Sequence, residues 1–170
     1  MLTYQLLSNI IAVDMSILFK VVITMKTVTT HFLKLNSKIF RNLQTHLDKK
    51  LKKYDLSSGT FWYLFILEKN EGISQNKMSQ EIGNDKAMSA RTISKLIEQD
   101  YVFKKQHEEN SSAYKLYLTQ KAKDILPNLH EDIESLTQAL TYDLSEEEFS
   151  ITIGALSKIF DISQRLREEE

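Results

Sequence analysis

No cysteine occurs in the 170 residues, which excludes disulfide bonds, thiolate metal sites, cysteine nucleophiles and thiol-based redox sensing. Proline occurs once and glycine four times. So few turn-forming residues argue against a turn-rich β fold and favour long helices. The absence of cysteine also fits a reducing cytosol, and we expect a cytoplasmic protein.

Signatures of catalysis and of metal binding are missing too. The sequence has no Gly-rich phosphate loop, no His-Glu-x-x-His and no Gly-x-Ser-x-Gly. The histidines form no i, i+4 pair of the kind that zinc sites use on one helix; they are His31, His46, His107 and His130. We expect no catalytic residue, metal or cofactor. An unrecognised enzyme site and a zinc site assembled between helices stay open as alternatives.

The net charge is −1, but the charges are distributed unevenly. Residues 34–53 carry seven Lys/Arg and one acid, whereas residues 120–170 carry five Lys/Arg and twelve acids. A chain split in this way can turn a basic face toward an anion while it stays nearly neutral as a whole.

Residues 1–25 are apolar on every side rather than along one stripe. A signal peptide is not expected, because the start lacks a basic region and Asp14 interrupts the apolar run. A membrane span is not expected either, because Asp14 and Lys20 would each cost about 2.5–3.5 kcal/mol at a helix centre. We interpret the segment as an extra helix packed on the body or on a second subunit. A gene start at Met15 or Met25, or membrane association, are the alternatives.

The apolar period predicts a helix over 30–53 with a basic opposite side. Two interpretations of this basic side are open: it attracts DNA by long-range electrostatics, or it is only a solvated face. A short, buried helix follows around Phe61–Leu67, with Ser57 or Ser58 as its N-cap.

A helix-turn-helix is predicted next. Ser74 caps a short helix that Gly83 ends, and Asn84 or Asp85 caps the following helix. Two helices separated by about three residues around a glycine are typical of this motif.

The second of these helices contains the stretch AMSARTISKL, residues 87–96. At 100° per residue, one side, taken as the inward one, holds Met88, Ser89, Thr92, Ile93, Leu96 and Ile97. The outward side is small, hydroxylated and basic, without an acid. Small residues let a backbone approach base edges, and an arginine can pair with guanine or phosphate.

The period then changes from 3.6 to 2 over YVFKKQH and again over AYKLYLT, with EENSS between them. This alternation predicts a β-hairpin. A helix-turn-helix followed directly by a hairpin is a winged helix.

Two helices complete the chain. Thr119 caps a long helix that contains Pro127, and Ser145-Glu146-Glu147-Glu148 reads as a capping box for the last helix. The long apolar stripes of the first and the last two helices exceed what a small winged helix can cover. Uncovered stripes of that length imply a partner, most simply a second copy.

This order of elements resembles the MarR family of bacterial transcriptional regulators. The resemblance is carried by LDKKLKKYDLSSGTFWYLFIL, then GISQNKMSQEIGNDKAMSARTISKLIEQDYV, then LYLTQKAKDIL. Two positions depart from the family pattern. Asp100 stands where a glycine is common, and Asn110-Ser111-Ser112 replaces the usual Asp-x-Arg of the wing tip, so the minor-groove arginine is missing.

The fold class expected is mostly α: a helix-turn-helix with a two-stranded wing, flanked by N- and C-terminal dimerisation helices. The expected parts are an extension (1–25), a dimerisation helix (26–56), a winged helix-turn-helix domain (57–119) and C-terminal dimerisation helices (120–170).

The resemblance implies a homodimeric repressor that binds a pseudopalindromic duplex operator and is released by a small aromatic effector. A winged-helix protein-interaction module that does not bind DNA is the alternative. The candidate DNA-binding residues are Ser74, Gln75, Asn76, Lys86, Ala87, Ala90, Arg91, Ser94, Lys95, Lys104, Lys105, Ser111, Ser112 and Lys115.

The aromatic residues around Trp62 either belong to the core or line a ligand pocket. The resemblance implies an effector pocket at Phe40, Leu43, Leu47, Trp62 and Phe65. The sequence does not identify the operator, the regulated genes, the effector or the sign of regulation.

Overall fold

A computed structural model describes residues 30–106 and 114–169 of the chain. The chain divides into two compact units, one that ends at Gly59 and one over Thr60–Glu170. The interpretations offered for residues 1–25 lie outside the described residues.

The first unit is a helix over 30–51, followed by the 3₁₀ turn η1, Lys52–Tyr54. The predicted helix is therefore confirmed, with a tightened last turn. Leu51 and Leu56 are buried, whereas most side chains of residues 30–50 are exposed.

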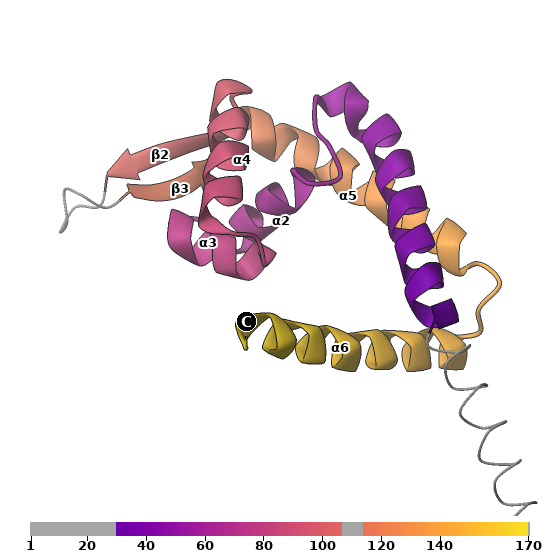
Figure 1. The fold of residues 1–170 in the computed structure, drawn as a ribbon. Coiled ribbons are helices and arrows are strands. Elements are labelled where there is room, and N and C mark those ends of the chain that lie inside the picture. Colours follow the sequence, from indigo (N-terminus) through magenta and orange to yellow (C-terminus); the bar gives the residue numbers. More distant parts are fainter. Residues whose placement is uncertain (1–29, 107–113, 170) are drawn as a thin grey trace, which may run out of the picture. The chain divides into compact units, whose positions relative to one another are not determined.

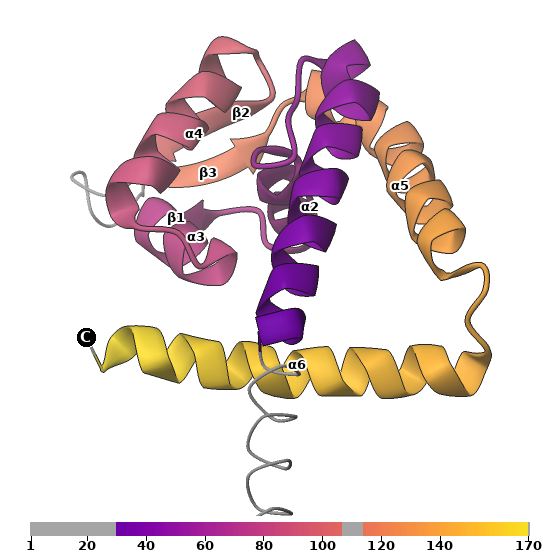
Figure 2. The ribbon, with the colours of Figure 1, turned by 45° about the vertical axis from the view of Figure 1, so that its right-hand side comes forward.

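Within its described residues, the second unit contains five helices and three strands (Figure 1 and Figure 2). They are α2 (Phe61–Lys69), β1 (Ile73–Ser74), α3 (Gln75–Ile82), α4 (Lys86–Glu98), β2 (Val102–Gln106), β3 (Tyr114–Leu118), α5 (Gln120–Thr141) and α6 (Glu146–Glu168). The strands form an antiparallel sheet in the order β1-β3-β2. The predicted winged-helix fold is confirmed.

Side-chain caps start four of these helices, as the sequence predicted. Ser74 accepts from the third backbone N–H of α3, and Asp85 and Thr119 do the same for α4 and α5. Ser145 and Glu148 form a full capping box at α6. Each cap satisfies an N–H that the helix itself leaves without a partner.

The predicted cap of α2 is wrong. The helix begins at Phe61 after Thr60, which makes no side-chain cap hydrogen bond. Ser58 instead donates its backbone N–H to Asp48 Oδ1 at 2.7 Å. Ser57 and Ser58 lie too far upstream of the first helical residue to cap it.

The core of the second unit lies between α2, α3, α4, the sheet and the start of α5. Its buried apolar side chains include Phe61, Tyr63, Leu64, Leu67, Met78, Ile93, Leu96, Leu116, Leu118, Leu126 and Leu129. These residues orient α3 and α4 relative to one another, which positions the surface described below.

The strand β1 was not predicted. Ile73 pairs with Leu116 of β3, and the Gly72 N–H donates to the Leu116 carbonyl at 2.8 Å (Figure 2). Two residues are too few to show an alternation, so no pattern could reveal this strand. Gly72 has φ +84, and a Cβ there would lie 3.2 Å from the Tyr117 hydroxyl, so the turn requires glycine.

Asp100 adopts the left-handed conformation, with φ 58, between α4 and β2. An aspartate stands here where glycine is common in the family. Asp adopts the left-handed conformation more readily than most residues do. We expect Asp100→Ala to lower the free energy of unfolding by about 1 kcal/mol and Asp100→Gly to preserve it. Denaturant unfolding measures both variants, with Asp161→Ala in α6 as the control. Equal stability of the alanine and glycine variants would contradict the expectation.

A pH dependence is expected from the α6 capping box. The Ser145 backbone N–H and hydroxyl donate to Glu148 Oε2, both at 2.9 Å, and hold the pKa of this carboxyl below its ordinary value of 4.5. The contribution of this cap to the stability of α6 is therefore complete when the pH is above 4.5. It is lost as the pH falls through the lowered pKa of Glu148. Circular dichroism should therefore show an acid loss of helix that Glu148→Ala lacks. If the wild type and Glu148→Ala lose helix along the same curve as the pH is lowered, the result would be inconsistent with this cap.

Candidate DNA-binding surface

One backbone conformation and two hydrogen bonds define the turn between α3 and α4. Gly83 takes φ +75 at the end of α3. The Asn84 N–H donates to the Ser79 carbonyl at 3.1 Å, and Asp85 Oδ1 accepts from Met88 N at 2.8 Å. Together these bonds fix the point and direction at which α4 leaves the turn.

The outward face of α4 carries no acid from Lys86 to Lys95. Four predicted DNA-binding residues are exposed there, namely Ala87, Arg91, Ser94 and Lys95, and Lys86 is exposed at the start of the helix. Ala90 is half-buried, so it lies at the edge of this face rather than at its centre. The structure therefore brings these predicted residues onto one helix.

The expectation that Met88 faces inward is wrong, because its side chain is 50% exposed. The buried positions of α4 are Ser89, Ile93 and Leu96. Met88 precedes this row by 100° on the helix and therefore lies outside the core. It adds a polarisable apolar side chain to the outward face, a residue that the sequence analysis missed.

The start of α3 offers a second group of donors. Ser74 and Asn76 are exposed and Gln75 is half-buried. Ser74 Oγ accepts from Lys77 N at 3.2 Å, and the earlier N–H groups of the first turn have no intrahelical partner by geometry. Such a helix start attracts phosphate through its N–H groups and dipole.

The wing separates its three predicted lysines. Lys105 lies opposite Lys115 in the register, so both point to one face of the sheet. Lys104 pairs with the buried Leu116 and points to the other face. The predicted wing-tip residues Ser111 and Ser112 lie outside the described residues.

Beside Lys105 and Lys115, the outer face of the wing carries a stacked aromatic pair. The Phe103 and Tyr117 ring centroids are 5.5 Å apart, with 22° between the ring planes. This pair stiffens the two strands on the same face as the lysines.

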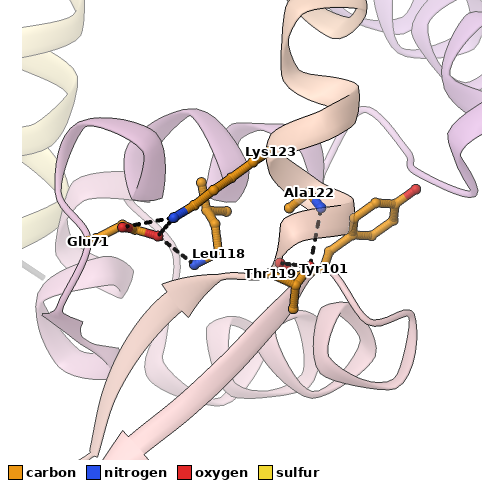
Figure 3. A network of polar contacts seen from close by, with 6 residues as sticks. All are labelled: Glu71, Tyr101, Leu118, Thr119, Ala122 and Lys123. Carbon is orange, nitrogen blue, oxygen red and sulfur yellow. Dashed lines mark hydrogen bonds and ion pairs between the residues drawn. The ribbon is translucent and has the colours of Figure 1, made fainter.

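A polar network fixes the base of the wing to α5 and to the turn after α2 (Figure 3). Glu71 Oε1 accepts from the Leu118 N–H at 3.1 Å and pairs with Lys123 Nζ at 3.0 Å. Thr119 Oγ1 donates to the Asp100 carbonyl at 2.7 Å and caps α5 at Ala122 N. These contacts hold the two ends of the hairpin to the rest of the unit.

The five residues predicted to line an effector pocket are divided between the two units. Phe40, Leu43 and Leu47 belong to the first, Trp62 and Phe65 to the second. Trp62 is 51% exposed, and its ring centroid lies 5.9 Å from that of Phe65. Nothing described brings all five residues together.

Phe65 also stacks on His130 of α5, with centroids 4.2 Å apart, and His130 Nε2 lies 2.7 Å from Glu68 Oε2. This contact joins α2 to α5. A neighbouring depression that the sequence did not predict is lined by Glu68, Glu71, Leu118, Lys123, Leu126 and Pro127.

Over residues 30–106 and 114–169, the histidines and acids form no group of three or more that could hold a metal ion. Within the same residues, no helix is long and apolar enough to cross a membrane.

A helix-turn-helix, a wing and an outward basic helix define the class of winged helix-turn-helix proteins. No protein-family model matches the chain. The chain is 30% identical over 129 residues to the HTH-type transcriptional regulator BilQ of Clostridioides difficile (strain CD3), covering 76% of this chain and 87% of that protein.

Solved structures agree with this similarity. A MarR transcriptional regulator from Methanosarcina mazei Go1 has 28% identity and a TM-score of 0.70, over 78% of this chain and 96% of that one. The S. aureus MepR–DNA complex shares the fold, with a TM-score of 0.68 and 18% identity over 75% of this chain and 92% of that one. The chain belongs to the MarR family of winged-helix transcriptional regulators, which are not enzymes.

Proposed function

We propose that the chain acts as a cytoplasmic homodimeric repressor that places α4 of each subunit in the major groove of a pseudopalindromic operator. The exposed, acid-free face of α4 from Lys86 to Lys95 carries this proposal. MepR, with the same fold, has been solved bound to DNA.

The chemistry of this face suits a major groove. Ala87 lets the helix backbone approach the base edges and can pack on a thymine methyl group. Arg91 can make a bidentate contact with guanine, and Ser94 and Lys95 can reach bases or phosphates farther along the helix. The first turn of α3 and the Lys105–Lys115 pair supply phosphate contacts on either side.

A second copy of the chain accounts for the exposed apolar side chains of the terminal helices. In the first unit these are Phe32, Leu33, Leu35, Ile39 and Phe40, and in α6 they are Phe149, Ile151, Ile153, Leu156, Ile159, Phe160, Ile162 and Leu166. So many exposed apolar side chains along one helix are typical of an interface. A two-fold dimer would present two α4 helices to half-sites about one helical turn, ~34–36 Å, apart.

Release by a small aromatic effector completes the proposal. Support comes from α2, where the half-exposed Trp62 and the stacked Phe65–His130 pair offer aromatic surface to a planar ligand. An effector that prefers one arrangement of the dimer would shift the population away from the DNA-binding form.

Binding to DNA selected from a genomic library, followed by a salt series, tests this function. The logarithm of the association constant should fall with log salt by about 0.9 for each phosphate neutralised. Unlabelled random duplex serves as the competitor. Feeble, salt-independent binding that selects no sequence would contradict the repressor and favour a protein-interaction module.

A further inference from the structure

The N-terminal half of α4 is held to the domain by a single buried side chain. Of the thirteen residues of α4, the buried ones are Ser89, Ile93 and Leu96, and the last two belong to the C-terminal half. Ser89 is fully buried and polar. The half of the helix that begins at the turn is therefore attached through a hydroxyl rather than through an apolar side chain.

Tyr63 of α2 is the partner of this hydroxyl. Its side chain is fully buried, and its Oη donates to Ser89 Oγ at 3.1 Å. Asn84 Nδ2, in the turn before α4, donates to the same Tyr63 Oη at 3.3 Å. One phenol thus connects α2, the turn and the first turns of α4.

The connection through Tyr63 is directional, whereas the apolar contacts of α4 with the core are not. Apolar contacts at Ile93 and Leu96 favour burial but tolerate small rotations of a helix about its axis, because the hydrophobic effect is not directional. A hydrogen bond weakens steeply when its angle departs from the linear range. The Tyr63–Ser89 bond therefore limits the rotation of the end of α4 that carries Ala87 and Arg91.

We propose that Tyr63 is a positioning residue for sequence readout: its hydroxyl fixes the orientation of the N-terminal half of α4, and with it the direction of Arg91. The inference rests on the proposed function, in which this half of α4 contacts base edges. Phosphate contacts from the start of α3 and from the wing do not depend on it, because those elements do not contact the Tyr63 hydroxyl through any described hydrogen bond.

Tyr63→Phe tests the inference, because it removes only the hydroxyl. We expect the affinity for the selected operator to fall about three- to tenfold, the equivalent of one lost hydrogen bond. Affinity for random duplex should stay within about twofold, since it depends on phosphate contacts. The ratio of the two affinities is the readout, because a residue that only stabilises the fold would not change it.

Four further variants make the experiment decisive. Ser89→Ala removes the other partner and should lower the same ratio; the double variant should be no worse than the poorer single variant. Tyr101→Phe removes a hydroxyl from a buried ring beyond the C-terminal end of α4, and Ile73→Val provides a mild loss of stability elsewhere. Both controls should keep the wild-type ratio, with all measurements made well below the unfolding temperature.

The outcomes separate the two claims. If Arg91→Ala binds the operator as the wild type does, the proposed function fails. If Arg91→Ala weakens binding but Tyr63→Phe keeps the wild-type affinity ratio, or loses both affinities equally, the positioning role of Tyr63 is overturned. A lowered ratio in Tyr63→Phe and Ser89→Ala, with unchanged controls, supports the inference.

Discussion

Arg91→Ala is expected to weaken operator binding by about 10- to 100-fold, because a bidentate arginine–guanine contact contributes about 1–3 kcal/mol of discrimination. Arg91 is exposed in the middle of the outward face of α4. Fluorescence anisotropy with a labelled operator at fixed salt measures the change.

Arg91→Lys is the matched variant, since it keeps the positive charge and loses the planar fork. It should retain the salt dependence of binding while it loses discrimination at one base pair of each half-site. If the alanine variant binds the operator as tightly as the wild type, α4 does not read the DNA as described.

The second large effect is expected at the proposed dimer interface. Leu156→Glu puts a charge on the apolar side of α6, where Leu156 is 51% exposed in the single chain. Burial of a leucine contributes about 1.5–3 kcal/mol, and a two-fold dimer has the change twice, so the dimer dissociation constant should rise at least about 100-fold. Analytical ultracentrifugation over a concentration series measures this constant.

Gly154→Glu is the control, because it adds the same charge two residues before Leu156, on the opposite side of α6, where no atom lies within 4 Å of an added Cβ. It should leave the dimer intact. Operator affinity should fall with dimerisation in Leu156→Glu, since a monomer contacts only one half-site. If Leu156→Glu has the same dimer dissociation constant as the wild type, the interface lies elsewhere.

Most of the correct predictions came from sequence patterns over a few neighbouring residues. The caps at Ser74, Thr119 and Ser145 depend on residues three positions apart, so the sequence alone contains both partners of each bond. Asp85 was one of two alternatives for α4, and only the structure distinguishes it from Asn84. Alternation likewise predicted β2 and β3.

The misplaced Met88, the missed strand β1 and the missed contact of Tyr63 share one cause, which is tertiary contact. A helical wheel places Met88 at the edge of the inward side, 100° before Ser89, and only the packing of α4 determines where the core ends. The strand β1 exists because β3 pairs with it, and the hydroxyl of Tyr63 matters because Ser89, 26 residues later, is buried beside it. Long-range pairings of this kind leave no period in the sequence.

Methylation protection of guanine N7 on the selected operator tests the central claim most directly, because N7 lies in the major groove that α4 is proposed to enter. We expect two protected patches with centres about one helical turn, ~34–36 Å, apart, and loss of both patches with Arg91→Ala. Binding that leaves every guanine N7 accessible, or protection that is the same with Arg91→Ala, would contradict the account.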